Sequence, residues 1–188
     1  MDDEYAGSLN MEEMALNDIK TGKDFDIEKF QEILARDNQK YAFNLALKYI
    51  SIKRRTVSET KKYLLTKEID TDVADTAVKK ILDYGYLNDL EYAKDFVIYQ
   101  INAAKYGRIV IIHKLKAKGI DEETIEEAMK IFDENIERGI AMGAYDKVRK
   151  KYRSLPGSKQ RAKTYRALMS KGFSYDIIKA IQSDEDQE

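Results

Sequence analysis

The chain has 188 residues, of which 43% are hydrophobic, 36% are charged and none is cysteine. This composition is sufficient for a folded core and excludes a disulfide scaffold or a zinc site built from thiols. No apolar run reaches the roughly 20 residues that cross a bilayer, and the acidic start of the chain lacks the basic region of a signal peptide. We therefore expect a cytoplasmic protein without membrane insertion.

The net charge of -1 conceals a strong segregation of charge. Residues 1–44 hold eleven acids and five bases, whereas residues 147–171 hold ten bases and no acid. The ten bases are Lys147, Arg149, Lys150, Lys151, Arg153, Lys159, Arg161, Lys163, Arg166 and Lys171. A solvated helix face is the alternative explanation, but the complete absence of acids favours binding to a polyanion or to an acidic partner.

Helical periodicity begins after a weakly patterned stretch over residues 1–22. A first amphipathic helix is predicted from about Ile27, and a second, separate helix is predicted over residues 38–54, ending in the basic cluster Lys53-Arg54-Arg55. Thr56 and Glu59 then have the spacing of a capping box, in which each side chain binds the other residue's backbone N–H, so a new helix should begin there.

The next joint lies at residues 85–97. Gly85 suits the left-handed end of one helix, and Asn88 or Asp89 can cap the following helix. Tyr92 and Phe96 lie one turn apart on that helix, and we expect both to pack between the first and second repeats described next.

One pattern occurs three times, with Leu64, Leu115 and Leu168 each three residues before a lysine. The lysines Lys67, Lys118 and Lys171 are spaced by 51 and 53 residues, which indicates an internal repeat. Gly119 and Gly172 suit the left-handed position after a helix, and Asp121 and Ser174 suit the N-cap of the next helix. Leu115 and Leu168 should therefore be equivalent buried residues.

A longer helix precedes each copy of the pattern, so each repeat should contain three helices. The predicted fold is all-α, with three tandem three-helix repeats forming an elongated, curved, solenoid-like molecule and an acidic N-terminal extension. The expected divisions are a partly helical extension over residues 1–37, repeats over residues 38–86 and 87–133, and a third repeat with an acidic tail over residues 134–188. Helix content should exceed about 65%, against roughly one third in an average domain.

Residues typical of catalysis are few. His113 is the only histidine and is expected at the surface or half buried, while the acids at 122, 123, 126 and 127 occupy first turns of a helix, where the helix dipole favours them. No phosphate-binding glycine motif is present, and Gly139 and Gly143 indicate close helix packing instead. We therefore predict no enzyme, no cofactor and no metal site.

Basic and aromatic residues provide the candidates for binding. Five tyrosines could stack on single-stranded bases, although packing in the repeat core is favoured for them: Tyr84, Tyr86, Tyr92, Tyr99 and Tyr106. The candidate contact residues for DNA or a protein partner are Lys53, Arg54, Arg55, Arg108, Lys114, Lys118, Lys147, Lys150, Lys151, Arg153, Lys159, Arg161, Lys163, Arg166 and Lys171. They would lie along one face if the repeats stack in register.

Several of these motifs, in this order, resemble the RecX family over about residues 45–183. The resemblance is carried by the stretch from Ala46 through Lys53-Arg54-Arg55-Thr56 to Glu59, by Gly85-Tyr86-Leu87-Asn88-Asp89 with Phe96-Val97, by Gly107-Arg108-Ile109-Val110, by Lys118-Gly119-Ile120 and by Lys171-Gly172-Phe173-Ser174. The chain departs from the family pattern at Thr60, Glu68, Gly139 and Gly143.

The resemblance implies a regulator that is not an enzyme. Such a protein binds the RecA nucleoprotein filament and inhibits ATP hydrolysis, strand exchange and repressor cleavage by RecA. The basic face would meet DNA phosphates, of single-stranded DNA in particular, or acidic RecA surface, and the residues alone do not separate the two. The alternative is a stand-alone helical nucleic-acid-binding protein without a RecA partner. We expect a monomer and assign no role to residues 1–44.

Overall fold

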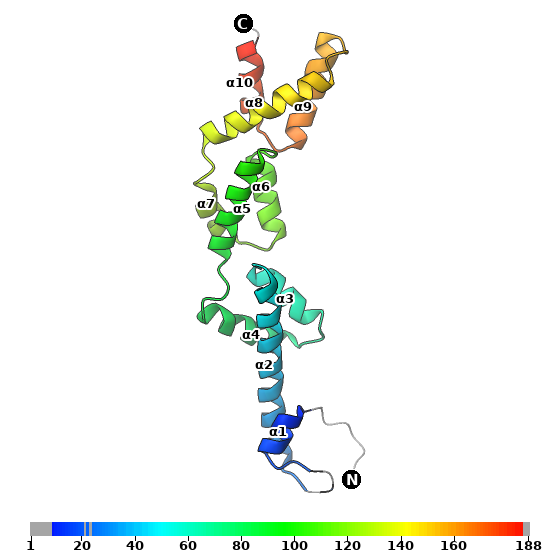
Figure 1. The fold of residues 1–188 in the computed structure, drawn as a ribbon, viewed down its shortest axis with the longest axis vertical. Coiled ribbons are helices and arrows are strands. Elements are labelled where there is room, and N and C mark those ends of the chain that lie inside the picture. The colour runs from blue at the N-terminus through cyan, green and yellow to red at the C-terminus, as the bar shows by residue number, and fades with distance from the viewer. Residues whose placement is uncertain (1–8, 21, 23, 186–188) are drawn as a thin grey trace. The chain divides into compact units, whose positions relative to one another are not determined.

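The computed structural model describes residues 9–20, 22 and 24–185, and ten helices lie in this part of the chain (Figure 1). Helices account for 74% of the described residues and no strand occurs among them, which confirms the all-α class and the expected helix content. The chain divides into two compact units, Met1–Leu87 and Asn88–Glu188. Residues 1–8 of the expected acidic extension and 186–188 of the expected acidic tail lie outside the described residues.

The first unit contains α1 (Met11–Leu16), α2 (Ile27–Ile52), α3 (Val57–Leu65) and α4 (Thr71–Asp83). The long helix α2 packs against both α3 and α4 (Figure 1). Small residues on α2 let the helices approach closely, because they bring little side-chain volume to the contact. The buried core of this unit consists of Ala42, Ala46, Leu64, Ala74, Ala77, Val78, Ile81 and Leu87.

Helix α2 corrects one expectation. Separate helices were predicted on either side of residues 37 and 38, but α2 is a single helix of 26 residues that runs through both. Asp37 does not cap a new helix; its carboxylate accepts a hydrogen bond from the backbone N–H of Asn10 at 2.9 Å. Without a proline or glycine at this point, nothing in the backbone interrupts the helix.

Charged side chains attach α1 to α2. The Glu13 carboxylate is buried and lies 2.8 Å from the Arg36 guanidinium, while Lys40 lies 2.9 Å from Glu12. The hydrogen bond and charge of Glu12 raise the pKa of Lys40. The bases of α2 near this helix are therefore largely occupied by acids of α1.

The second unit contains α5 (Asp89–Ala103), α6 (Arg108–Ala117), α7 (Glu122–Met129), α8 (Glu134–Lys151), α9 (Gly157–Ser170) and α10 (Tyr175–Glu185). Helix α5 packs against α7, and α8 packs against both α9 and α10. One continuous buried cluster runs through the unit, from Ala93 and Val97 on α5 to Ile178 and Ile181 on α10. Tyr92 and Phe96 are partly buried against this same cluster.

The repeated pattern has the same local structure in each copy. The side chains of Leu64, Leu115 and Leu168 are each 0% exposed, which confirms that they are equivalent core positions. Each leucine carbonyl also accepts a hydrogen bond of 3.3 Å from a backbone N–H five residues later, at Ile69, Ile120 and Phe173 respectively. Such a bond closes a helix end of the Schellman type.

Glycine supplies the left-handed residue of this turn in two copies. Gly119 and Gly172 have φ angles of 78° and 86°, as expected, whereas the first copy places Glu68 there with φ of 61°. Gly85 also adopts the expected left-handed conformation, and Asn88 caps α5 by accepting from the Glu91 N–H at 2.9 Å.

The predicted N-caps are also present. The hydroxyl of Thr56 accepts from the Glu59 N–H at 3.1 Å and the Glu59 carboxylate accepts from the Thr56 N–H at 3.3 Å, so the capping box is confirmed. Asp121 accepts from the Thr124 N–H at 2.8 Å and Ser174 from the Ile177 N–H at 3.3 Å. Each of these helices therefore begins where its cap residue indicates.

Close backbone packing occurs at a different pair of glycines from the expected one. A Cβ atom added at Gly139 or Gly143 would meet nothing within 4 Å, so the predicted helix contact at these positions is wrong. A Cβ atom at Gly107 would instead lie 2.4 Å from the Gly172 carbonyl oxygen. The Gly107 N–H donates to the Lys171 carbonyl at 2.9 Å, so the start of α6 and the end of α9 touch through their backbones.

Candidate nucleic-acid interface

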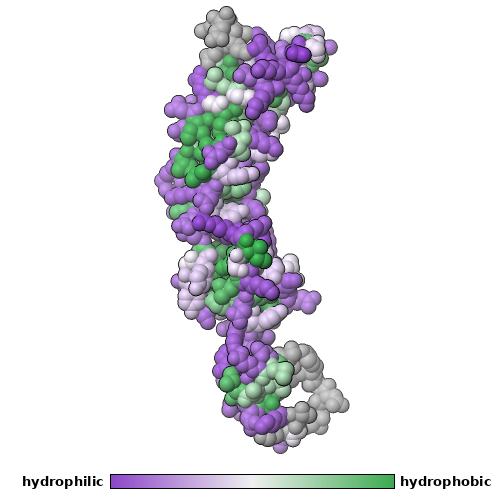
Figure 2. All heavy atoms as spheres, in the orientation of Figure 1, coloured by the Kyte–Doolittle hydropathy of each residue, from purple (hydrophilic) through white to green (hydrophobic). Residues whose placement is uncertain are grey.

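Helices α8 and α9 form the most basic surface of the second unit. We call the α8–α9 segment from residue 147 to residue 166 the basic hairpin. Its exposed bases are Lys147, Arg149, Lys150, Lys151, Arg153, Lys159, Arg161, Lys163 and Arg166, and Lys171 follows it, half buried, at the end of α9. Figure 2 shows mostly hydrophilic residues over this end of the unit.

Apolar packing and one long-range bond hold the basic hairpin together. Ile140, Ala144 and Tyr145 on α8 and Leu168 on α9 belong to the buried cluster of the unit. The amide of Gln160 donates to the Arg149 carbonyl at 3.2 Å, which ties the second turn of α9 to the last turn of α8. With their apolar sides buried, the two helices leave their bases to solvent.

The two ends of the basic hairpin differ in what explains their charge. Arg149, Lys150 and Lys151 lie in the last turn of α8, where the negative end of the helix dipole favours cations. Helix α9 has no acid in its first turn, and Lys159 lies there, where the dipole disfavours cations. The dipole thus accounts for these three bases of α8 but not for Lys159, whose position favours an anionic ligand.

The bases predicted on α6 are engaged within their own unit. The Arg108 guanidinium donates to the Phe132 carbonyl and lies 3.6 Å from the carboxylate of Glu137, which is 4% exposed. Glu137 also accepts from the Arg108 backbone N–H at 2.8 Å. Arg108 thereby compensates a buried charge, a role that the spacing of bases along the sequence does not reveal.

Lys114 and Lys118 have local partners as well. The ammonium of Lys114 lies 3.7 Å from the centre of the Tyr106 ring. A hydrogen bond from Lys105, together with the charge of Lys114, lowers the pKa of the Tyr106 hydroxyl. Lys118 is half buried and caps the end of α6.

A second basic region lies in the first unit, at the joint between α2 and α3. Lys53 and Arg54 are exposed there, and Arg55 is half buried with its guanidinium carbon 4.1 Å from the centre of the Tyr49 ring. Tyr49 and Tyr63 stack face to face, with ring centres 3.9 Å apart. Sequence reasoning did not connect the two tyrosines, because Tyr49 lies on α2 and Tyr63 on α3, and no local pattern indicates that their rings meet.

The structure corrects the expectation that five tyrosines pack in the core. Tyr84 and Tyr86 are each 59% exposed and Tyr99 is 67% exposed, whereas Tyr92 and Tyr106 are partly buried. Tyr84 and Tyr86 lie in the tight turn after α4, which contributes too few neighbours to cover a ring. Their rings are 6.0 Å apart, and Tyr84 also contacts Phe43 edge-on at 5.9 Å.

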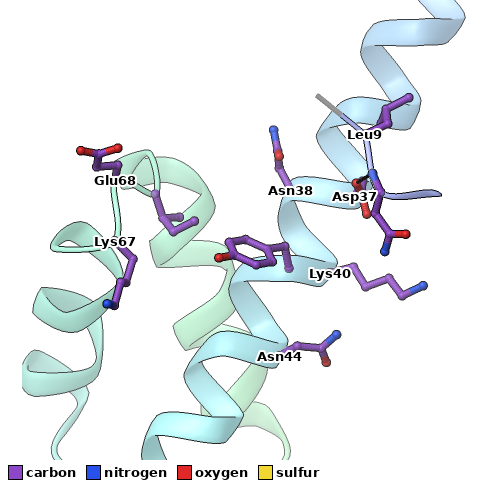
Figure 3. A pocket seen from close by; sticks show the side chains of 10 residues that line it. Leu9, Asp37, Asn38, Lys40, Asn44, Lys67 and Glu68 are labelled. Atoms are coloured by element: carbon purple, nitrogen blue, oxygen red, sulfur yellow. Dashed lines mark hydrogen bonds between the residues drawn. The ribbon is translucent and has the colours of Figure 1, made fainter. Parts of the chain in front are cut away.

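The first unit also contains a groove beside α2, of about 700 Å³ (Figure 3). Asn38, Lys40 and Asn44 line it from α2, and Lys67 and Glu68 line it from the turn after α3. Its acid Asp37 and base Lys40 are already bound to Asn10 and Glu12. The groove therefore brings together amides, the bound charges of Asp37 and Lys40, and the exposed side chains of Lys67 and Glu68.

The described residues hold neither a metal-binding cluster nor a membrane-spanning helix. His113 is exposed, as one of the two expected placements had it. Among the described residues, no three His, Asp or Glu side chains gather in a way that could hold a metal ion. In the same part of the chain, every helix is too short or too polar to cross a bilayer.

Comparisons with known proteins identify the architecture. Models of the first, second and third three-helix domains of RecX match residues 42–80, 88–129 and 139–181. The chain is 33% identical to a regulatory protein RecX from Bacillus velezensis and 32% identical to one from Bacillus subtilis. Both alignments cover 100% of this chain, and they cover 72% and 74% of the two relatives.

A solved structure agrees with these sequence matches. The crystal structure of a regulatory protein RecX superposes with a TM-score of 0.80 and 25% identity, covering 93% of this chain and 86% of that chain. The three domain matches confirm the three tandem three-helix repeats that the sequence predicted. With sequence, domain order and fold in agreement, the chain belongs to the RecX family of regulatory proteins.

Proposed function

We propose that this protein binds the RecA nucleoprotein filament and inhibits RecA activities, namely ATP hydrolysis, strand exchange and repressor cleavage. Its membership of a family of regulatory proteins supports this role. It would act as a monomer in the cytoplasm, without catalytic chemistry of its own. Recombination and the response to DNA damage would be modulated through the filament.

The basic hairpin is the proposed contact surface, and the observation that carries this proposal is its charge. Ten bases and no acid lie between Lys147 and Lys171, and nine of the ten are exposed. Lys159 in the first turn of α9 opposes the helix dipole, so a ligand explains it better than helix stability does. Phosphates of the single-stranded DNA in the filament would bind them with release of counterions.

Charge reversal in the basic hairpin tests this proposal. The combined variant Lys150→Glu, Lys151→Glu and Arg153→Glu should weaken inhibition of RecA-catalysed ATP hydrolysis on single-stranded DNA. The fold should persist, because all three positions are exposed. Reversal of Lys150 and Lys151 in the last turn of α8 should lower the free energy of unfolding by about 0.3 to 1 kcal/mol each through the helix dipole, and melting curves measure this loss. Each lost phosphate contact should reduce the steepness of log affinity against log salt by about 0.7.

A matched control changes the same net charge elsewhere. Lys29, Lys79 and Lys179 are exposed and lie outside the basic hairpin, so their joint replacement by Glu should leave inhibition nearly intact. Equal loss in both triple variants would show that net charge, not the hairpin, is responsible. Wild-type protein that leaves hydrolysis unchanged at micromolar concentration, with RecA of the same organism, would overturn the regulatory role and favour a stand-alone nucleic-acid-binding protein.

A further inference from the structure

Arg55 is held in an unusual way at the joint between α2 and α3. Its guanidinium carbon lies 4.1 Å from the centre of the Tyr49 ring. Its Nε atom is buried and has no hydrogen-bond partner among the residues that the structure describes. A buried donor without an acceptor is unfavourable, so hydrogen bonding of Nε within the unit does not explain why Arg55 lies here.

Two tyrosines form the support of this guanidinium. The rings of Tyr49 and Tyr63 are 3.9 Å apart and inclined by only 4°. Since Tyr63 occupies one face of Tyr49 at that distance, Arg55 must occupy the other face. Two aromatic faces repel each other electrostatically, and a cation on an outer face offsets this repulsion.

Lys67 adds a second cation, with its ammonium 5.7 Å from the centre of the Tyr63 ring. We call Arg55, Tyr49, Tyr63 and Lys67 the cation–aromatic column. Arg55 lies over the face of Tyr49, and a planar guanidinium can stack on such a face while its N–H donors point outward. Because Arg55 is only half buried, part of its side chain stays accessible to a ligand.

The surroundings of the column are positively charged. Between residues 45 and 67 the chain has seven bases, Lys48, Lys53, Arg54, Arg55, Lys61, Lys62 and Lys67, and one acid, Glu59. One of these bases, Lys61, forms a salt bridge of 2.5 Å with Asp75 of α4. The Glu59 carboxylate is already bound to the Thr56 N–H at 3.3 Å in the capping box. Several cations in a row suit the evenly spaced charges of a nucleic-acid backbone better than a single carboxylate.

We propose that Arg55 binds a backbone phosphate of single-stranded DNA through its planar fork, with Tyr49 and Tyr63 as positioning residues. This site belongs to the first unit and acts in addition to the basic hairpin. The inference rests on the proposed function in one respect, since it requires direct contact between the chain and DNA. Two phosphate oxygens match the fork of an arginine, whereas a lysine offers only a point charge.

The test measures affinity of the full chain for a fluorescently labelled single-stranded oligothymidylate at several salt concentrations. Arg55→Gln should weaken binding and reduce the steepness of the salt dependence by about 0.7. Arg55→Lys should leave that steepness unchanged and still weaken binding, because the charge is kept and the fork is lost. Lys79→Gln, a charge removed from an exposed site on α4, should leave the steepness unchanged.

The positioning role is tested by the aromatic support alone. Tyr49→Leu should weaken binding about two- to fivefold at constant salt dependence, which corresponds to one exposed cation–π contact. Tyr49→Phe keeps the ring face and should bind like the wild type. Thermal melting of each variant separates loss of binding from loss of fold. If Tyr49→Leu fails to fold, the affinities of Tyr49→Phe and Arg55→Lys test the inference instead.

Four results would overturn the inference. Arg55→Lys binding like the wild type at every salt concentration would exclude the fork, and Tyr49→Leu binding like the wild type would exclude the column. Arg55 variants that lose RecA inhibition but keep their affinity for the oligothymidylate would show that the occupant is an acidic protein surface. Wild-type protein that neither binds the oligonucleotide nor inhibits RecA would defeat the proposed function as well, so the two failures are distinguishable.

Discussion

The turn after α3 in the first unit and the turn after α9 in the second unit close with the same hydrogen bond. They differ in whether the left-handed position can hold a side chain. In both turns a buried leucine carbonyl accepts a bond of 3.3 Å, at Leu64 and at Leu168. The left-handed residue is Glu68 in the first turn and Gly172 in the second. Gly172 is also pressed against α6, since an added Cβ would lie 2.5 Å from the Val110 nitrogen.

The difference shows which part of a turn depends on local structure and which on its neighbours. The leucine and its bond are needed wherever the helix must end, so they occur in all three copies. A side chain at the left-handed position is tolerated only with some strain, and only where no other segment approaches. Glu68 is therefore accommodated at the cost of backbone strain. At residue 172, both the left-handed backbone and the close approach of α6 require glycine.

The largest expected effect comes from the shared leucine. Leu64→Ala, Leu115→Ala and Leu168→Ala should each lower the free energy of unfolding by about 2 to 5 kcal/mol, because each removes a fully buried side chain. Denaturant unfolding of each variant measures this loss. Leu65→Ala is the control, since Leu65 is 40% exposed and its loss should be much smaller. Equal stability of the Leu65 and Leu64 variants would refute the equivalence of the turns.

The next effect separates strain from close contact. Gly85→Ala should destabilise by roughly 1 to 2 kcal/mol, because its φ is positive but nothing lies within 4 Å of the added Cβ. Gly172→Ala carries the same strain and a backbone clash in addition, and should lower the free energy of unfolding by about 1 to 3 kcal/mol more than Gly85→Ala does. Thermal melting compares the two variants. Similar losses would mean that α6 moves away from α9 easily.

A smaller effect of opposite sign is expected at Glu68. Glu68→Gly removes the left-handed strain of about 1 to 2 kcal/mol but makes the unfolded chain more flexible, which offsets about 0.4 to 1 kcal/mol of the gain. The net result should be a stabilisation of about 0.5 to 1 kcal/mol, seen as a higher melting temperature. A destabilised Glu68→Gly variant would show that the Glu68 side chain makes a favourable contribution of its own.

The smallest effect concerns the caps that follow these turns. Asp121 caps α7 and its pKa is lowered, chiefly by the hydrogen bond from the Thr124 backbone, whereas Asp70 precedes α4 without a side-chain cap bond. A lowered folded-state pKa means that this stabilisation is present above the ordinary aspartate value of 3.8 and is lost as the pH falls through the lower folded value.

Melting temperatures measured across acidic pH test this difference. Asp121→Asn should keep the cap at neutral pH, since asparagine caps helices equally well, and should lose less stability than the wild type on acidification. Asp70→Asn is the control and should follow the wild type at every pH. Parallel curves for wild type and Asp121→Asn would show that the Asp121 charge does not contribute.

Much of the fold could be predicted because its signals are local. The capping box at Thr56, the left-handed Gly85 and Gly119, and the cap at Asp121 each depend on residues within one or two turns. The three buried leucines followed from the repeat register in the same way. The continuous helix α2 was missed because a change of pattern near residues 37 and 38 looked like a boundary, although nothing there interrupts the backbone.

The candidate interface likewise has features that the sequence predicts and features that only the folded chain reveals. The basic hairpin could be recognised from nine bases without an acid between residues 147 and 166, because a charge run on amphipathic helices is exposed almost wherever the helices pack. The partner of an individual basic side chain could not be predicted, since it depends on segments far along the chain. Arg108 is taken up by Phe132 and Glu137, and Arg55 is held against Tyr49 and Tyr63.

Most helix ends, the threefold repeat and the segregation of charge could be predicted from the residues alone, because caps, left-handed glycines and apolar periodicity act over a few residues. The contact between Gly107 and Gly172, the open space at Gly139 and Gly143 and the different partners of Arg108 and Arg55 became evident only in the folded chain. These outcomes depend on which surfaces meet when the helices pack. Such contacts join residues tens of positions apart, and no local pattern encodes them.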